Sequence, residues 1–266
     1  MKLFGVVKLL ALLVALDLTT IATAVAQPAS PPSSKADDAF TYYYRDPRPE
    51  RLVGVLDSLG KKPRDWIAYP PVAGILAVVF ATQPGWIGKL IPAQLDARLA
   101  TTIAAALQLS GQPVSRDLQA RLAQAGTDPT LAAQFAGLPN RLTDLRIAIP
   151  THLDILWGAS FASGDGRYVL MIIDFMARTA NRSEPIALEI VRVAAGVGRK
   201  DSGYLATLKD KYDQRLLIEI AYAATAAWAL TSNAHQHGFV DVTVKRYISE
   251  HPGTWGAKVL AVLKAS

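Results

Sequence analysis

The sequence predicts an all-α protein made of stacked helical hairpins, arranged either as an α-solenoid-like array or as an irregular multi-helix bundle. Apolar residues recur at helical spacing in one segment after another, and glycine and proline interrupt the pattern at short intervals. The alternation typical of strands is scarce, and only residues 145–149 and 240–244 show it. Both stretches are short, so we expect no sheet.

The first 26 residues have the pattern of a secretory signal peptide. A basic start precedes an apolar run over residues 9–16, and Ala24 and Ala26 are small residues at the positions that a signal peptidase recognises. The alternative is an uncleaved membrane anchor, but Asp17 interrupts the apolar run. A carboxylate at the centre of a spanning helix costs roughly 2.5–3.5 kcal/mol. We therefore expect cleavage after Ala26 and a periplasmic or secreted mature protein.

The segment after the signal peptide differs in composition from the rest of the chain. Residues 27–39 contain proline, serine and charged residues but no large apolar side chain, so we expect a flexible leader there. A single all-helical domain is then expected over residues 40–266. Pro49 and Glu50 suit the first turn of its first helix, because proline needs no amide partner there and an acid is stabilised at the positive helix end.

The later helices are bounded by residues that start or stop a helix. Ser115 and residues 127–129 start two of them, and residues 163–166 are predicted to cap one helix and begin the next. Residues 215–231 are apolar nearly all round, which predicts the most buried helix of the domain. In chain order, the predicted helices cover residues 49–59, 70–81, 95–109, 115–125, 129–136, 152–162, 167–179, 186–195, 204–212, 215–231, 239–249 and 255–263.

A loose internal repetition accompanies these helices. Residues 80–87 and 161–169 share one pattern, in which an aromatic near a helix end is followed by a small polar turn and an aromatic with a branched residue. Residues 228–240 form a looser third copy. With the intermediate breaks, the interval is roughly 26–34 residues, within the range of helical repeats. Stacked hairpins produce such spacing, but so does an ordinary bundle whose helices have similar lengths.

The composition excludes several kinds of chemistry. The chain has no cysteine, which excludes disulfides, thiol nucleophiles and cysteine-ligated metals. The formal net charge of +6 is modest, and we interpret it as a solvated surface rather than a patch for anionic lipids or glycans. Basic pairs without interleaved aromatics, behind an export signal, argue against a nucleic-acid partner. The sequence contains no nucleophile elbow, phosphate loop or calcium loop.

Two glutamates in apolar helical segments, Glu189 and Glu219, are candidate catalytic residues. A carboxyl group buried against apolar surface can have a raised pKa and act as a general acid in glycan cleavage. Each glutamate also has a partner on its own helix, Arg192 for the first and Arg215 for the second. We favour structural ion pairs over catalysis.

His235, His237 and Asp241 are candidate metal ligands, because two imidazoles and a carboxylate at this spacing suit zinc or copper. A further ligand would have to come from elsewhere in the chain. Asn233, Gln236 and Gly238 surround the histidines with the composition of a polar turn between helices. We favour the turn, and we expect no cofactor.

The segment before the first helix is the candidate binding site. It combines aromatic and arginine side chains, which are enriched at protein interfaces. The alternative is an N-terminal arm that packs on its own domain. The candidate binding residues are Tyr42, Tyr43, Tyr44, Arg45 and Arg48.

These features predict an exported helical binding or scaffold protein of the bacterial cell envelope. We expect its partner to be an envelope protein held in a groove or concave face between successive helices, assisted by the aromatic-arginine arm. One alternative is an envelope glycan hydrolase with Glu189 or Glu219 as general acid. Another is a peripheral membrane protein, bound through an uncleaved N-terminus or a basic surface. The oligomeric state does not follow from the sequence.

Overall fold

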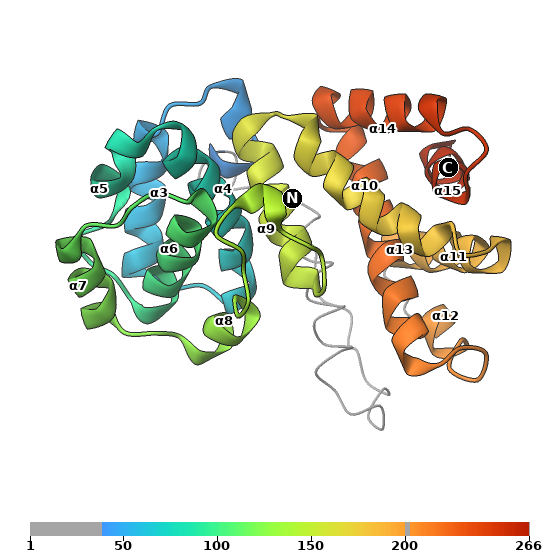
Figure 1. Ribbon diagram of the computed structural model, residues 1–266, viewed down its shortest axis with the longest axis horizontal. Coiled ribbons are helices and arrows are strands. Elements are labelled where there is room, and N and C mark those ends of the chain that lie inside the picture. Colours follow the sequence, from blue (N-terminus) through green and yellow to red (C-terminus); the bar gives the residue numbers. More distant parts are fainter. Residues whose placement is uncertain (1–38, 200–202, 266) are drawn as a thin grey trace. The chain divides into compact units, whose positions relative to one another are not determined.

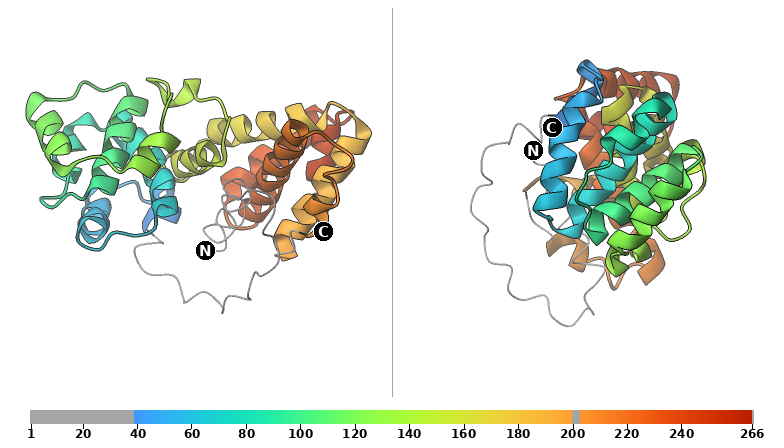
Figure 2. Two further views of the ribbon diagram at one scale, coloured as in Figure 1. Left: turned by 90° about the horizontal axis from the view of Figure 1, so that it is seen from below. Right: turned by 90° about the vertical axis from the view of Figure 1, so that its left-hand side faces the viewer.

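The computed structural model describes residues 39–199 and 203–265, and every regular element in those ranges is a helix (Figure 1). The predicted all-α fold class is confirmed, and the helical character is visible from further sides as well (Figure 2). The predicted signal peptide and almost all of the predicted leader lie outside the described residues. Contacts between Cα atoms divide the chain into two compact units, Met1–Gly164 and Asp165–Ser266. The single domain over residues 40–266 stays a prediction.

The first unit is built around α4 (Tyr69–Thr82), which packs against both α6 (Ala97–Ser110) and α9 (Pro150–Ser163). Because α4 is apolar all round and buried along nearly its whole length, it is the core helix of this unit. The other elements of the unit are η1 (Tyr43–Arg45), α3 (Glu50–Lys61), η2 (Trp66–Ala68), η3 (Pro84–Trp86), α5 (Ile87–Leu90), α7 (Arg116–Ala125), α8 (Pro129–Gln134) and η4 (Leu142–Asp144).

Two glycines let the main chains of α4 and α9 touch. A Cβ atom at Gly74 would lie 1.9 Å from the carbonyl oxygen of Ile155, and one at Gly158 would lie 2.0 Å from the carbonyl oxygen of Pro71. Both obstacles are backbone atoms, which cannot rotate away as a side chain can. Any side chain at either position would therefore force the two helices apart, and close-packed interiors tolerate such displacement poorly.

No single helix among the described residues is long and apolar enough to cross a membrane. The segments Trp66–Thr82 and Pro84–Leu90 meet the length and composition requirement only when taken together, and they are bent by 118°.

The second unit is centred on α13 (Gln214–Ala234), which packs against the four longer helices of the unit. Helix α15 (Trp255–Ala265) also packs against α10 (Gly166–Ala180) and α11 (Glu184–Arg199), so helices far apart in sequence are neighbours. Because a solenoid repeat contacts only its sequence neighbours, this unit has the arrangement of an irregular bundle. Its other elements are α10 (Gly166–Ala180), α11 (Glu184–Arg199), α12 (Gly203–Ala206), α14 (Gly238–Glu250) and α15 (Trp255–Ala265).

Local signals located several helix ends correctly. The side chains of Ser115 and Asp128 accept hydrogen bonds from the first turns of α7 and α8. Gly164 ends α9 with a φ of 64°, in the left-handed region that favours glycine, and Asp165 accepts a hydrogen bond from the amide of Arg167 at 2.9 Å. The predicted cap and restart at residues 163–166 are therefore confirmed.

Three helix predictions are wrong. The helix predicted over residues 186–195 is α11, which continues through Gly196, because Val193 and Val197 are buried and extend its apolar face. Of residues 204–212, only the first turn is helical, as α12, and the rest form turns. Burial on α13 begins at Ile220, whereas α9 is buried along nearly its whole length. The predicted segment 215–231 is therefore not the most buried helix.

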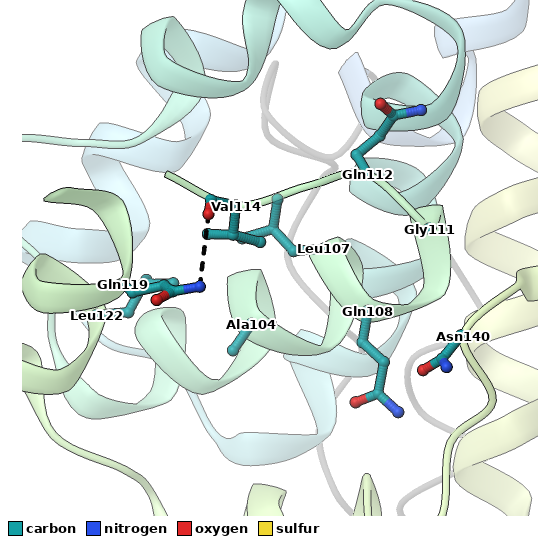
Figure 3. A pocket seen from close by; sticks show the side chains of 9 residues that line it. All are labelled: Ala104, Leu107, Gln108, Gly111, Gln112, Val114, Gln119, Leu122 and Asn140. Atoms are coloured by element: carbon teal, nitrogen blue, oxygen red, sulfur yellow. Dashed lines mark hydrogen bonds between the residues drawn. The ribbon is translucent and has the colours of Figure 1, made fainter. Parts of the chain in front are cut away.

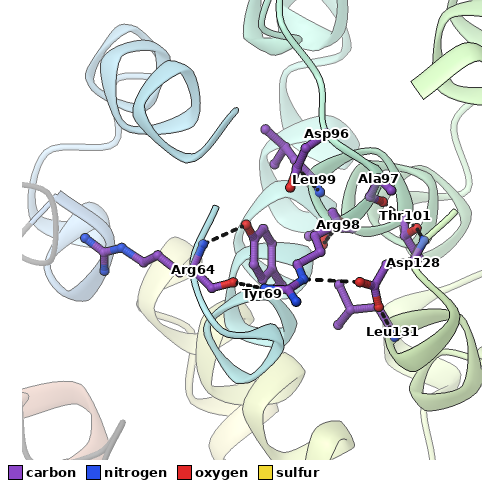
Figure 4. A network of polar contacts seen from close by, with 10 residues as sticks. Arg64, Tyr69, Asp96, Ala97, Arg98, Leu99, Thr101, Asp128 and Leu131 are labelled. Atoms are coloured by element: carbon purple, nitrogen blue, oxygen red, sulfur yellow. Dashed lines mark hydrogen bonds and ion pairs between the residues drawn. The ribbon is translucent and has the colours of Figure 1, made fainter. Parts of the chain in front are cut away.

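A polar network joins α6 to the start of α8 (Figure 4). Asp128 accepts a hydrogen bond from the amide of Leu131 at 2.9 Å, and its other carboxylate oxygen lies 3.1 Å from Nε of Arg98. The amide of Asp128 donates to Oγ1 of Thr101 at 3.0 Å, and Arg98 also donates to the carbonyl oxygen of Arg64. The hydrogen bond from Leu131, followed by the contact with Arg98, holds the pKa of Asp128 below its ordinary value.

Replacing Asp128 by alanine should lower the free energy of unfolding by about 1–2 kcal/mol, because the change removes a helix cap and an ion pair. The pKa of Asp128 is lowered in the folded state, so its contribution is present above the unfolded pKa of about 3.9 and is lost as the pH falls through the folded pKa. Denaturant titrations at about pH 7 and about pH 3 should show the larger loss at the higher pH. The control is Asp144→Ala, at an exposed acid. Equal losses at both pH values would contradict the assignment.

Candidate functional site

A groove between α6 and α7 is the candidate binding site of the first unit (Figure 3). Its volume is about 440 Å³, within the range of small-ligand sites. No ionisable side chain lines it. The lining combines two kinds of side chain. Apolar contacts come from Ala104, Leu107, Val114 and Leu122, and carboxamides come from Gln108, Gln112, Gln119 and Asn140.

Two of the carboxamides are held in place by main-chain carbonyl groups. Gln119 donates through Nε2 to the carbonyl oxygen of Val114 at 3.4 Å, and Gln108 donates through Nε2 to that of Leu138 at 2.5 Å (the first is drawn in Figure 3). No sequence pattern predicts this groove. Exposed glutamines on helices carry no signal of their own, and only the packing of α6 against α7 brings these side chains together.

Among the predicted binding residues, Tyr43 differs from its neighbours. It is buried, with 1% of its surface exposed, and burial raises the pKa of its hydroxyl to about 12. Tyr42 and Tyr44 are half-buried, and the guanidinium carbon of Arg45 lies 4.4 Å and 5.7 Å from their ring centroids. Arg45 also donates through Nε to the hydroxyl of Tyr44 at 3.2 Å. Tyr43 therefore anchors a segment whose neighbours form a stacked, partly exposed cluster.

Arg48 completes the outer side of this segment. Its guanidinium makes a bidentate contact with Asp46, at 2.8 Å and 2.6 Å, and its side chain is 67% exposed. The segment also packs on its own unit, because η1 contacts α9 and the ring of Tyr44 lies against Gly164. The segment packs on its own unit, as one interpretation of the sequence expects. It also leaves Arg45 and Arg48 exposed, as the interpretation as a binding site requires.

Glu189 lies buried on α11, and three donors surround its carboxylate. Nζ of Lys211 lies 2.5 Å from one oxygen, while the hydroxyl of Tyr204 donates to the other, which also lies 3.4 Å from Arg192. Burial raises the pKa of Glu189, but the hydrogen bonds from Lys211 and Tyr204 outweigh it and hold the pKa below its ordinary value. A general acid needs a raised pKa. The contacts therefore favour the structural ion pair.

Glu219 also has partners on both of its oxygens. One oxygen lies 3.3 Å from Nε of Arg215, the helical neighbour identified in the sequence, and the other pairs with Arg182. The Glu219 side chain is one quarter exposed. This arrangement links α13 to the residues between α10 and α11, as a structural ion pair does.

The structure does not bring the three candidate metal ligands into one site. His235 is exposed after the end of α13, whereas His237 is buried at the start of α14. Asp241 pairs with Lys245 at 2.8 Å and with Lys264, and these lysines lower its pKa. Across the described residues, no group of three or more histidine, cysteine, aspartate or glutamate side chains is placed to hold a metal ion.

Asp154 on α9 is a buried carboxyl group that is not among the residues predicted to form a site. It is 7% exposed, and its side chain makes no hydrogen bond or ion pair with any described residue. Burial raises the pKa of Asp154 to about 8, so this carboxyl group is largely protonated at neutral pH. Its position as a single acid between Leu153 and Ile155 is a sequence signal that could have indicated a buried carboxyl group.

Replacing Asp154 by asparagine should raise the free energy of unfolding at neutral pH. Unfolded Asp154 ionises near pH 4, while the folded residue holds its proton up to about pH 8. Between these values, rising pH favours the unfolded chain by about 1.4 kcal/mol for each pH unit. Denaturant titrations across this range should show a flatter pH dependence for Asp154→Asn than for the parent. Parallel pH profiles would contradict this, and Asp174→Asn, at an exposed acid on α10, is the control.

Replacing Glu189 by glutamine should loosen residues 203–212, because Lys211 and Tyr204 lose the charged acceptor that holds them to α11. Hydrogen bonds to charged groups contribute about 1.5–3 kcal/mol, so amide exchange in this segment should accelerate by at least about tenfold. Hydrogen exchange measured by mass spectrometry should show unchanged rates in α13. Glu184→Gln, at an exposed position on the same helix, should change neither segment. Unaltered exchange over residues 203–212 would refute the conclusion that Glu189 holds this segment to α11.

Comparison with known proteins adds no functional assignment to these contacts. No family model, curated protein or solved structure matches the chain. The candidate sites are therefore defined by the geometry of this chain alone.

Proposed function

We propose that this chain is an exported helical binding or scaffold protein of the bacterial cell envelope, which acts by holding an envelope protein. The observation that carries the proposal is the cluster of Tyr42, Tyr44, Arg45 and Arg48, which we call the arm surface. Tyrosine and arginine are over-represented among the residues that dominate binding energy at protein interfaces. The export step is inferred from the residue pattern of positions 1–26.

The arm surface is preorganised. Buried Tyr43 anchors it, and the amide of Asp46 donates to the carbonyl oxygen of Tyr43 at 3.0 Å. The bidentate contact between Arg48 and Asp46 fixes the next turn. A surface that is already ordered loses less conformational entropy when a partner binds, which favours affinity.

The glycan hydrolase alternative has weaker support. Its two candidate acids, Glu189 and Glu219, each accept contacts from cationic side chains, and the pKa of Glu189 is lowered rather than raised. These features oppose the transfer of a proton to a leaving group.

The arm surface can be tested by crosslinking the tagged, processed protein in its native envelope and identifying the captured species by mass spectrometry. We expect one protein partner at near-stoichiometric yield. The double variant Tyr42→Ala, Arg45→Ala should reduce that yield by about tenfold or more, the scale of an interface hot spot. Its melting temperature should stay close to that of the parent, because Tyr43 is left in place.

The matched control is Lys61→Ala, Lys62→Ala, which removes two exposed cations from another part of the same unit. It should leave the captured yield unchanged. An undiminished yield from the arm variant would remove the arm surface from the proposal. Recovery of glycan or lipid without a protein partner would overturn the proposed function itself.

A further inference from the structure

We propose that the groove between α6 and α7 binds an uncharged, extended peptide segment that carries an aliphatic side chain. This inference rests on the proposed function, because it names the chemistry of the segment that a protein partner would place there. Three features support it: the hydrogen-bonding groups of the lining, the main-chain groups without hydrogen bonds at its rim, and its apolar floor.

The lining matches a peptide unit in chemistry. The side chains of Gln108, Gln112, Gln119 and Asn140 are carboxamides, and a carboxamide both donates and accepts hydrogen bonds, as a peptide group does. The protein carries a net charge of +6, yet no charged side chain lines the groove. The lining side chains therefore offer no ionic contact to a charged ligand. The groove therefore suits a neutral ligand.

The rim of the groove offers main-chain groups to such a ligand. Residues 112–115 lie outside any helix, and Pro113 restricts Gln112 to extended conformations. The carbonyl group of Gln112 and the amide of Val114 make no hydrogen bond with any described residue. The carbonyl oxygen of Val114 is held by Gln119 at 3.4 Å (Figure 3). Main-chain groups of an extended segment that have no hydrogen-bond partner can pair with an added peptide strand.

The floor favours an aliphatic side chain over a sugar. Val114 and Leu122 are half-buried, so part of each side chain stays exposed for apolar contact, whereas Leu107 is buried. Burying an aliphatic group against them gains about 0.8 kcal/mol for each methylene. No aromatic ring, on which a sugar face would stack, lines the groove. Together the floor and the rim select a peptide rather than a neutral glycan.

The test is an NMR titration of the isotope-labelled mature protein with the blocked tripeptide acetyl-Ala-Leu-Ala-amide. We expect shifts of the side-chain amide signals of Gln112, Gln119 and Asn140, with a dissociation constant on the order of 1 mM. Gln112→Ala should weaken binding about fivefold, the effect of one hydrogen bond. Ala104→Trp, at an exposed lining position, should fill the groove and abolish binding. Gln124→Ala, an exposed glutamine on α7 outside the groove, is the matched control.

Three results would overturn the inference: no shift with the blocked peptide, equal shifts with the neutral disaccharide trehalose, or undiminished binding by an Ala104→Trp variant whose helical circular dichroism equals that of the parent. The outcome is separable from that of the proposed function, because the crosslinking test changes only the arm surface. If a partner is captured but the peptide does not bind, only the proposal that the groove binds a peptide is refuted. Peptide binding with no captured partner would refute the envelope-partner proposal and leave the groove as a peptide site.

Discussion

The main-chain contact between α4 and α9 is the constraint on which the first unit depends. Carbonyl groups occupy the space that a Cβ atom would need at Gly74 and at Gly158, so the distance between the two helices is fixed by their backbones. The core helix α4 also packs against α6. The same α6 lines the groove and carries the arginine that holds the start of α8, so both features lie on a helix that packs on this core.

Each unit contains a buried carboxyl group, and the pKa values of the two groups are shifted in opposite directions. Glu189 has a lysine, a tyrosine and an arginine around it, and it stays ionised despite its burial. Asp154 has no such donors, and its carboxyl group takes up a proton instead. The comparison shows that burial alone does not decide the charge of an acid; the donors that the fold brings to it do.

The sequence predicted those parts of the fold that local chemistry determines. Ser115 and Asp128 marked helix starts because a cap needs only the next turn. The helix predicted to end before Gly196 continues through it, because burial of Val193 and Val197 outweighs the low helix propensity of glycine. Arg192 could be predicted as a partner of Glu189 because it lies one turn further along the same helix. The groove, and the contacts of Tyr204 and Lys211 with Glu189, come from segments that only packing brings together, so no local sequence pattern predicts them. The fold class and the arm residues were therefore predictable from the sequence, and the groove between α6 and α7 was not.

Gly74 and Gly158 also bear on how distant relatives can be recognised. Glycine in a helix interior is destabilising by roughly 0.5–1 kcal/mol relative to alanine, so drift tends to remove it wherever another residue fits. At these two positions only hydrogen fits, and a replacement would have to move a backbone. A protein that shares this unit should therefore keep both glycines inside two apolar helices after most of its other residues have diverged. This pair of positions is a search pattern that can outlast overall sequence identity.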